Sequence, residues 1–235
     1  MQVKVSADTE IVVPASGHTW QVLRLGLVPY WEALDRQIAL VAERVSQSIP
    51  DTLVLLEHPP VVTLGRAKTT ENLRVSPEML QQQGIAFVEV TRGGDVTYHA
   101  PGQLVGYPIF DLTQHGRDVL QFCRRVEAAL IGVLDAHGIP ARAVPGKAGV
   151  WVGDRKIASM GVSLRRWVTF HGFALNVTTD LAGFQVIRPC GEDPEVMTSM
   201  AKELGQPVNL SIVCTEVIGA FQRTFQFGEP RLLTV

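Results

Sequence analysis

The sequence predicts a single α/β domain in which helices pack on a mixed β-sheet. Short apolar runs typical of strands alternate with longer segments whose apolar residues recur every three to four positions, as in amphipathic helices. The 235 residues, 46% of them hydrophobic, suffice for one sizeable core, and no repeat or Pro/Ser-rich linker divides them. We therefore expect an irregular N-terminal segment at residues 1–19 and one domain at residues 20–235.

Before residue 100, the pattern predicts a long helix, three strands and a short helix. They are expected at residues 30–48, at 52–56, 61–64 and 85–90, and between Ser76 and Gly84, respectively. In the long helix, Trp31, Ile38 and Val41 belong to the apolar face that we expect to be buried. Ser76 followed by Pro77 is a typical helix start, because serine caps the first turn and proline fits its backbone angles. The third strand is closed by Gly93-Gly94.

After residue 100, strands lie between two further long helices. The expected elements are an apolar run at residues 103–112, a helix at 117–137, strands around Val150, at 156–164 and at 168–177, and a last helix capped by Ser211. Gly138, with Pro140 close behind it, ends the helix at 117–137. Gly153-Asp154 makes a tight turn, and Arg165-Arg166 falls near the next one.

Composition excludes several classes of protein. A net charge of −2 provides no basic surface for nucleic acid. The apolar runs are too short to cross a bilayer, and Asp8 and Glu10 lie where a signal peptide needs an apolar stretch. Three widely spaced cysteines without a Cys-x-x-Cys motif predict neither a disulfide framework nor a zinc site. We expect a cytoplasmic protein without a metal.

Cys190 differs from the other two cysteines in its surroundings. Cys123 and Cys214 lie in helical patterns and are expected to be small core residues. Cys190 lies between Pro189 and Gly191, where a turn is expected. A thiol on a rigid, exposed turn is suited to act as a nucleophile, because the thiolate must reach a substrate carbonyl. The alternative is an unreactive loop cysteine.

A glycine-rich segment at residues 92–103 is the first candidate binding segment. Gly93-Gly94 allows backbone amides to approach a ligand closely, and Arg92 and His99 on either side offer groups that bond polar atoms. Neither of the common nucleotide-binding glycine motifs is present. An ordinary hairpin at Gly93-Gly94 remains the alternative.

Lys156 lies early in a predicted strand, within the second candidate segment at residues 149–161. Successive side chains of a strand point to opposite faces, so Lys156 points inward if Arg155 faces solvent. A buried ammonium group needs an anion or must lose its proton, and a thiolate at Cys190 would be such an anion. The alternative is a lysine that points to solvent.

The third candidate segment, residues 169–176, contains a glycine in mid-strand. Gly172 indicates close approach of a ligand or of a second backbone. We interpret the neighbouring His171 as a polar residue satisfied by its surroundings rather than as a catalytic one.

Taken together, these segments resemble the octanoyltransferases of lipoate biosynthesis, over roughly residues 20–225. The matching blocks are Arg92-Gly-Gly-x-x-Thr-Tyr-His99, Pro101-Gly-Gln103, Lys156-Ile-Ala-x-x-Gly161, Arg165-Arg-Trp167, His171-Gly172, Ala174-Leu-Asn176, Pro189-Cys-Gly191 and Thr198-Ser199. One position departs from the family pattern, since Ala100 stands where glycine is usual before Pro-Gly-Gln.

The resemblance implies a fold like the catalytic domain of biotin and lipoate protein ligases, with residues 20–235 as the acyltransferase domain. It implies transfer of octanoyl or lipoyl groups from octanoyl-acyl carrier protein to a lysine of lipoyl domains of 2-oxoacid dehydrogenase or glycine cleavage proteins. Cys190 would form the acyl thioester, and Lys156 would lower the pKa of the cysteine. The positions implied to bind substrate are Arg92, Gly93, Gly94, Asp95, Val96, Thr97, Tyr98, His99, Ser159, Met160, Gly161, Gly172, Phe173 and Ala174.

The expected mechanism needs no cofactor. Exchange of one thioester for another is nearly neutral in energy, and amide formation is downhill, so ATP is not required. An eight-carbon chain needs an apolar slot, for which Gly161, Gly172 and Ala174 would leave room. Three alternatives stay open at this point: an ATP-dependent lipoate or biotin ligase on the same fold, a cysteine thioesterase, and an acyl-binding module without activity.

Overall fold

The computed structural model describes residues 18–67 and 70–234. Its strands are β1 (Trp20–Leu27), β2 (Asp51–Glu57), β3 (Val61–Leu64), β4 (Ala86–Glu89), β5 (Val96–His99), β6 (Gln103–Ile109), β7 (Ala141–Val144), β8 (Lys147–Val152), β9 (Arg155–Arg165), β10 (Val168–Asn176) and β11 (Arg231–Thr234). Its α-helices are α1 (Tyr30–Val45), α2 (Pro77–Gln82), α3 (Val119–Ala136), α4 (Met200–Leu204) and α5 (Leu210–Phe225). Short 3₁₀ turns are η1 (Thr70–Asn72), η2 (Leu112–Gln114), η3 (Leu181–Val186), η4 (Pro189–Gly191) and η5 (Pro194–Val196).

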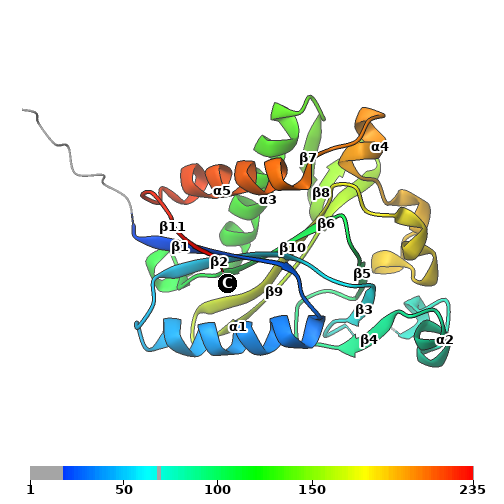
Figure 1. Cartoon of the computed structure of the whole chain (residues 1–235), viewed down its shortest axis with the longest axis horizontal. Helices are drawn as coiled ribbons and strands as arrows, with labels where there is room; N and C mark the ends of the chain where they lie inside the picture. The colour runs from blue at the N-terminus through cyan, green and yellow to red at the C-terminus, as the bar shows by residue number, and fades with distance from the viewer. Residues whose placement is uncertain (1–17, 68–69, 235) are drawn as a thin grey trace, which may run out of the picture.

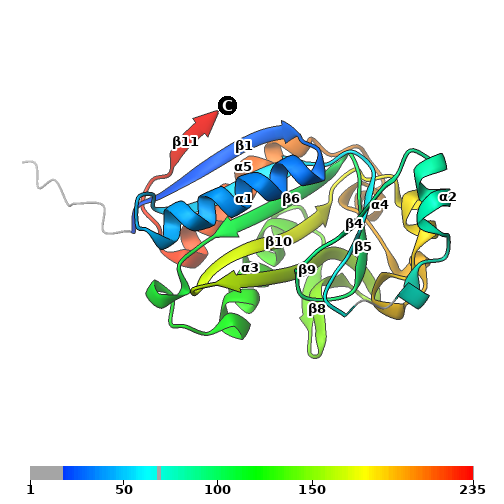
Figure 2. The ribbon, with the colours of Figure 1, turned by 90° about the horizontal axis from the view of Figure 1, so that it is seen from below.

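A mixed sheet forms the centre of the molecule, as the sequence predicts. Eight strands of the described residues pair in the order β11-β1-β2-β6-β10-β9-β8-β7. Strand β1 is parallel to both β2 and β11, whereas the pairs from β2 to β7 are antiparallel. A smaller sheet, in the order β4-β3-β5 within the same described residues, lies near one end of the large one (Figures 1 and 2).

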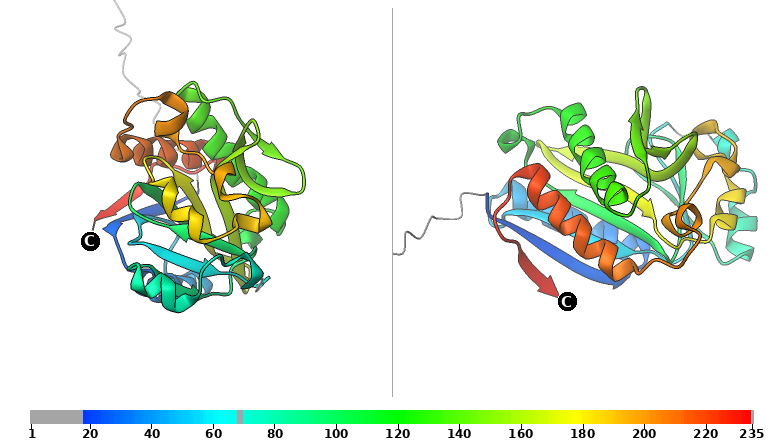
Figure 3. Two further views of the ribbon diagram at one scale, coloured as in Figure 1. Left: turned by 90° about the vertical axis from the view of Figure 1, so that its right-hand side faces the viewer. Right: turned by 90° about the horizontal axis from the view of Figure 1, so that it is seen from above.

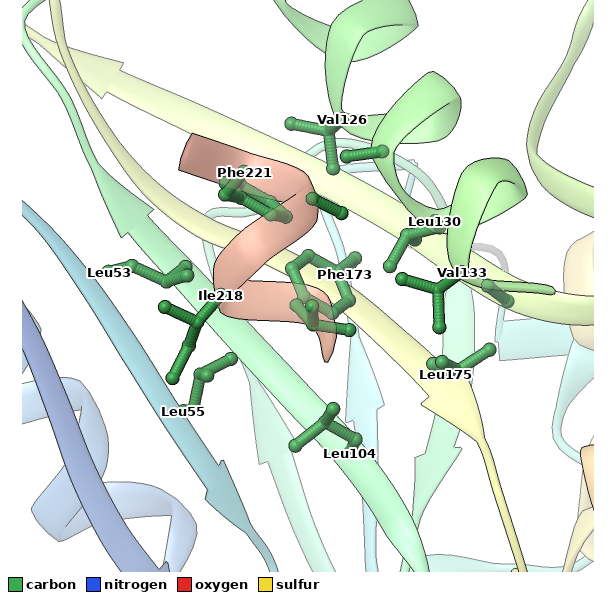
Figure 4. Close-up of a cluster of buried hydrophobic side chains, with 14 of the residues drawn as sticks. Leu53, Leu55, Leu104, Val126, Leu130, Val133, Phe173, Leu175, Ile218 and Phe221 are labelled. Atoms are coloured by element: carbon green, nitrogen blue, oxygen red, sulfur yellow. The ribbon is translucent and has the colours of Figure 1, made fainter. Parts of the chain in front are cut away.

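Helices cover both faces of the large sheet. Helix α1 lies along one face, and α3 and α5 lie together on the other (Figures 1 and 3). The core beneath α3 and α5 is aromatic at its centre, where Phe221 stacks on Phe173 with ring centroids 5.7 Å apart (Figure 4). The last helix contributes one apolar face to this core, since Val213, Val217, Phe221 and Phe225 are all buried. Among the described residues, no helix is long and apolar enough to span a membrane.

Helix α1 buries only part of the apolar face that we predict, since Val41 is buried as expected but two other members of that face are not. Trp31 and Ile38 are 55% and 45% exposed, whereas Gln37 and Arg44 are buried. The polar residues Gln37 and Arg44 face inward because they form hydrogen bonds with buried partners there. Gln37 Oε1 accepts a hydrogen bond from the His171 backbone N–H at 2.7 Å, and Arg44 Nε donates to Asp51 Oδ1 at 2.8 Å. Apolar periodicity cannot anticipate buried hydrogen bonds of this kind.

Side-chain caps determine where helices α2 and α5 begin, and the sequence analysis places one of these two caps at the wrong residue. Ser76 caps α2 as predicted, accepting a hydrogen bond from the Met79 N–H. The last helix begins two residues earlier than expected, because Asn209 rather than Ser211 is its cap and accepts from the N–H groups of Ser211 and Ile212. The turn after β9 is formed by Arg166 and Trp167, both with positive φ.

The predicted irregular segment at residues 1–19 lies outside the described residues, apart from its last two positions. His18 forms an isolated bridge with Phe227, beside the start of β1. Strands β1, β5, β7 and β11 were not predicted.

Candidate active site

A pocket of about 540 Å³, including its opening to solvent, lies between the small sheet and strands β9 and β10. Segments far apart in the chain form its wall. The lining residues are Tyr30, Arg92, Gly94, Asp95, Val96, Thr97, His99, Tyr107, Lys156, Ser159, Met160, Gly161, His171, Gly172, Phe173, Ala174 and Pro189. The three candidate segments of the sequence therefore meet at one site.

Two of the implied substrate-binding positions, Gly93 and Tyr98, do not line this pocket. The Gly93 N–H donates to the Val162 carbonyl at 3.0 Å, so Gly93 joins the glycine loop to β9. Tyr98 points into the small core, where its ring lies edge-on to Phe184 at 5.3 Å between centroids. Both residues hold the loop and β5 in place from behind the wall.

Lys156 is buried in the pocket wall, with 4% of its surface exposed. Its neighbour Arg155 faces outward and pairs with Glu203 at 2.7 Å, so the alternation expected for this strand is confirmed. The Lys156 Nζ lies 5.5 Å from the centre of the Trp151 ring. The backbone carbonyl of Lys156 accepts a hydrogen bond from the Thr198 N–H at 3.0 Å, so the segment before α4 holds this end of β9 in place.

The backbone of Cys190 lies in η4, a turn as expected, and the adjacent Pro189 lines the pocket. Hydrogen bonds fix this turn from both sides. The Arg188 N–H donates to the Asn72 carbonyl at 2.7 Å, and the Gly191 N–H donates to the Arg188 carbonyl at 3.1 Å. The Asn72 side chain in turn donates to Asp95 at the pocket wall. The other two cysteines match their expected environments, since Cys214 is buried and Cys123 half-buried.

Close backbone contacts explain the glycines that face the pocket. A Cβ atom at Gly172 would lie 2.2 Å from the Gly106 carbonyl oxygen, and one at Gly161 would lie 2.5 Å from that of Gly93. The expected approach of a second backbone to Gly172 is therefore confirmed. These glycines are required for the packing of neighbouring strands and loops, a reason independent of any room that they leave for a ligand.

Arg92 is held from behind by strand β3. Its Nη2 donates to the Thr63 carbonyl at 2.8 Å and to the Thr63 hydroxyl at 2.9 Å. This anchoring places a permanent positive charge at the pocket, and that charge contributes to lowering the pKa of His171 and His99.

Buried tyrosine and histidine rings form a cluster at the pocket. The sequence analysis does not identify three of its members, Tyr30, His58 and Tyr107. Tyr30, His58 and His99 pack with ring centroids 5.0 to 6.0 Å apart. His58 Nδ1 donates to the Val28 carbonyl at 2.6 Å, which leaves its Nε2 to accept from the Tyr107 hydroxyl at 2.6 Å. Each element supplies a single member, so no local motif marks them in the sequence.

Burial keeps these rings uncharged. Desolvation lowers the pKa of His58 to about 4 and raises that of Tyr30 to about 12. Desolvation also lowers the pKa of His99 well below its usual range and raises that of Tyr107 well above its own. At neutral pH, the cluster therefore contributes hydrogen-bonding groups without formal charge.

A chain of side-chain amides fixes the tautomer of His99. Asn176 Nδ2 donates to the Thr198 carbonyl at 2.9 Å, and its Oδ1 accepts from Gln103 Nε2 at 2.8 Å. Gln103 Oε1 therefore faces His99 Nδ1, 2.7 Å away, and must accept its proton. The second ring nitrogen of neutral His99, Nε2, is left with a lone pair in a residue that lines the pocket.

His171 is only partly satisfied by its surroundings, which differs from our interpretation of it. Its Nε2 is buried and has no hydrogen-bond partner among the described residues, and its Nδ1 lies 3.4 Å from the Tyr30 hydroxyl. The backbone of His171 has a φ of +56°, a strained conformation for this residue, supported by the hydrogen bond to Gln37. Desolvation, followed by the charge of Arg92, lowers the pKa of His171 to about 3.

Comparison with known proteins assigns the family. Residues 29–222 match the lipoyl protein ligase A/B catalytic domain. The chain belongs to this family. An octanoyltransferase of Solibacter usitatus is 52% identical over 204 residues, which cover 87% of this chain and 92% of that protein.

Solved structures of lipoate and biotin ligases share the fold. A crystal structure of lipoate-protein ligase A bound with ATP matches with a TM-score of 0.72 at 18% identity, over 93% of this chain and 89% of that one. The biotin protein ligase from Aquifex aeolicus in complex with biotin and ATP matches with a TM-score of 0.56 at 12% identity, over 88% and 70% of the two chains. The expected likeness to biotin and lipoate ligases is therefore confirmed.

Proposed function

We propose that this protein is an octanoyltransferase that passes its acyl group through a thioester on Cys190. The observation that carries this proposal is the meeting of buried Lys156 and the Cys190 turn, through Pro189, at one pocket. The identity of 52% to an octanoyltransferase favours transfer over the ATP-dependent ligase reaction, because the structural likeness to ligases extends only to the fold.

In the first step, the Cys190 thiolate attacks the thioester carbonyl of the octanoyl donor. The tetrahedral intermediate expels the donor thiolate, which takes up a proton, so one thioester replaces another. A Lys156 ammonium group near the turn favours the thiolate over the thiol, because an isolated charge in a buried site is costly.

In the second step, the amine of a lysine side chain attacks the octanoyl-Cys190 carbonyl. An amide bond forms, the Cys190 sulfur leaves, and the amine loses a proton to Lys156. The acylated cysteine no longer carries a negative charge, so Lys156 loses that stabilisation and can act as the base. No bond in either step is formed at the expense of ATP.

The pocket wall suits an alkyl chain beside this site. Met160, Phe173 and Ala174 line it together with the backbone of Gly161 and Gly172. The uncharged histidines and tyrosines add hydrogen-bonding atoms but no charge, so the part of the wall that they form has a lower desolvation cost than one lined by charged side chains.

The donor and the acceptor of the acyl group are part of the same proposal. We expect an octanoyl-acyl carrier protein as donor and the lysine of a lipoyl domain as acceptor, with the protein acting in the cytoplasm. A cysteine thioesterase is the second candidate, and release of free octanoate without modification of a lipoyl domain would favour it.

Substitution of Cys190 and Lys156 tests the proposal. Incubation of the wild-type protein with octanoyl-acyl carrier protein should add the mass of one octanoyl group, and Cys190→Ala should abolish this adduct. Lys156→Ala should slow alkylation of Cys190 by iodoacetamide at pH 7, by about tenfold or more, because the thiolate loses its ammonium partner. Intact-mass and peptide mass spectrometry measure both. An adduct of unchanged yield in Cys190→Ala would remove Cys190 from the reaction.

A further inference from the structure

Glu127 is a buried carboxylate behind the pocket wall that has no part in the scheme above. It lies in α3, on the face turned to the sheet. Its Oε1 accepts a hydrogen bond from the Gly149 N–H at 2.9 Å. Burial raises the pKa of Glu127, whereas this hydrogen bond and the charges of Arg124 and Lys156 lower it.

Gly149 separates this carboxylate from Lys156. Its φ is +106°, and a Cβ atom placed on it would lie 3.0 Å from Lys156 Cε. The lysine side chain therefore runs directly over Gly149, while the backbone N–H of the same residue is bonded to Glu127. Two contacts converge on one residue without a side chain and bring a carboxylate close to a buried lysine.

Other charged groups approach the same place from the neighbouring elements. The Nζ atom of Lys147, in β8, lies 4.9 Å from the centre of the Trp151 ring, which Lys156 also contacts. The same Nζ pairs with Glu192 Oε1, beyond η4, at 2.7 Å. This pair is half-exposed, so solvent screens it. From α3, Arg124 acts on Glu127, and Cys123 has its pKa raised to about 11 by burial and by the Glu127 charge.

We propose that Glu127 is a positioning residue for the transfer: its carboxylate, bonded to Gly149, stabilises the ammonium form of Lys156 and so sets the pH at which octanoyl-Cys190 reacts with an amine. This inference rests on the proposed function. The thiolate of Cys190 disappears when it is acylated, but the carboxylate of Glu127 remains. Lys156 therefore keeps one anionic neighbour throughout the cycle, and it gives up its proton at a higher pH than it would without Glu127.

Glu127→Gln separates the charge from the hydrogen bond. The amide oxygen of glutamine can still accept from the Gly149 N–H, so the variant removes the negative charge and keeps the contact. The experiment prepares octanoyl-Cys190 enzyme, mixes it with a lipoyl domain, and follows single-turnover transfer by mass spectrometry from pH 6 to pH 10. Glu216→Gln, a change of equal charge on the half-exposed face of α5, is the matched control.

The midpoint of the alkaline rise in rate should move to lower pH by about one unit in Glu127→Gln and should stay in place in Glu216→Gln. Identical profiles for the wild type and a folded Glu127→Gln would overturn the proposal and leave Glu127 as an acceptor for Gly149 alone. Failure of the wild type to form octanoyl-Cys190 would instead refute the proposed function.

A measurement on the wild-type protein covers the case in which the variant does not fold. The reactivity of Lys156 with acetic anhydride in the octanoyl-enzyme, mapped by peptide mass spectrometry against pH, reports its deprotonation. A midpoint of about 9 or above supports the carboxylate partner, because burial alone would lower the pKa of the lysine far below its ordinary value of about 10.4. A midpoint below about 9 overturns the proposal.

Discussion

At the scale of single residues, the pocket sets one buried lysine among imidazole rings that burial keeps neutral. Lys156 lies against Trp151, with Glu127 behind Gly149, whereas His58 is bonded to a backbone carbonyl and a tyrosine hydroxyl. The position of Lys156 follows from strand alternation, and so the sequence predicts it. That of His58 depends on partners about 30 and 50 positions away, which no local pattern encodes.

Neutral buried histidines make stability depend on pH in a defined direction. Their pKa values are about 4 for His58 and about 3 for His171, against an ordinary value of 6.5. Between these limits the unfolded chain binds more protons than the folded one. The free energy of unfolding should therefore fall as the pH is lowered below 6.5, by up to about 1.4 kcal/mol per pH unit for each histidine.

Urea denaturation at pH 7.5, 6 and 5 measures this slope. His171→Asn should reduce it, since one group that resists protonation is removed. An equal slope in His171→Asn and in the wild type would show that His171 is protonated in the folded protein.

At the scale of elements, strand β10 lines the pocket with Gly172, Phe173 and Ala174 and pairs with its neighbours β6 and β9. The sequence predicts the long helices and most interior strands because their apolar periodicity is local. Strand β1 was missed because both of its faces are covered, so that Trp20, Gln21 and Val22 are all buried and no alternation appears. Strand β11 was missed because it is short and pairs with β1, at the other end of the chain.

Gly172→Ala tests the close packing of β10 against β6. The added Cβ would meet the Gly106 carbonyl and Pro108, at 2.2 and 2.6 Å, so the two strands must separate. We expect a loss of about 1–3 kcal/mol in the free energy of unfolding, measured by urea denaturation. Gly132→Ala is the matched control, because nothing lies within 4 Å of its Cβ position and alanine favours a helix. Equal stability of both variants would mean that the β6–β10 contact yields at little cost.

At the scale of the whole molecule, the pocket exists only where both sheets, helix α1 and the η4 turn meet. The sequence predicts that the three candidate segments, residues 92–103, 149–161 and 169–176, belong to one site, through their resemblance to a family. It does not predict Tyr30 and Tyr107, because each is an isolated residue on an otherwise ordinary element. The tautomer of His99 likewise depends on β5, β6, β10 and the segment before α4, joined through Gln103 and Asn176.

Gln103→Leu tests this connection across the molecule. The variant leaves His99 Nδ1 and Asn176 Oδ1 without their partner, at a cost of about 1–3 kcal/mol in stability. In ¹⁵N NMR, the wild type should show His99 as the single tautomer protonated on Nδ1, and the variant should show a mixture. A mixture already present in the wild type would mean that the amide chain does not hold the ring.

The contact of the glycine loop with β9 has a consequence for how the enzyme meets its donor. The Gly93 N–H is bonded to Val162, and the Gly93 carbonyl leaves no room for a Cβ on Gly161. This part of the wall is ordered when the chain folds, so the acyl chain of the proposed substrate would not have to order it on binding. The conformational entropy of the loop is lost once, during folding, and under the proposed function acyl groups of different length would bind to the same preformed shape.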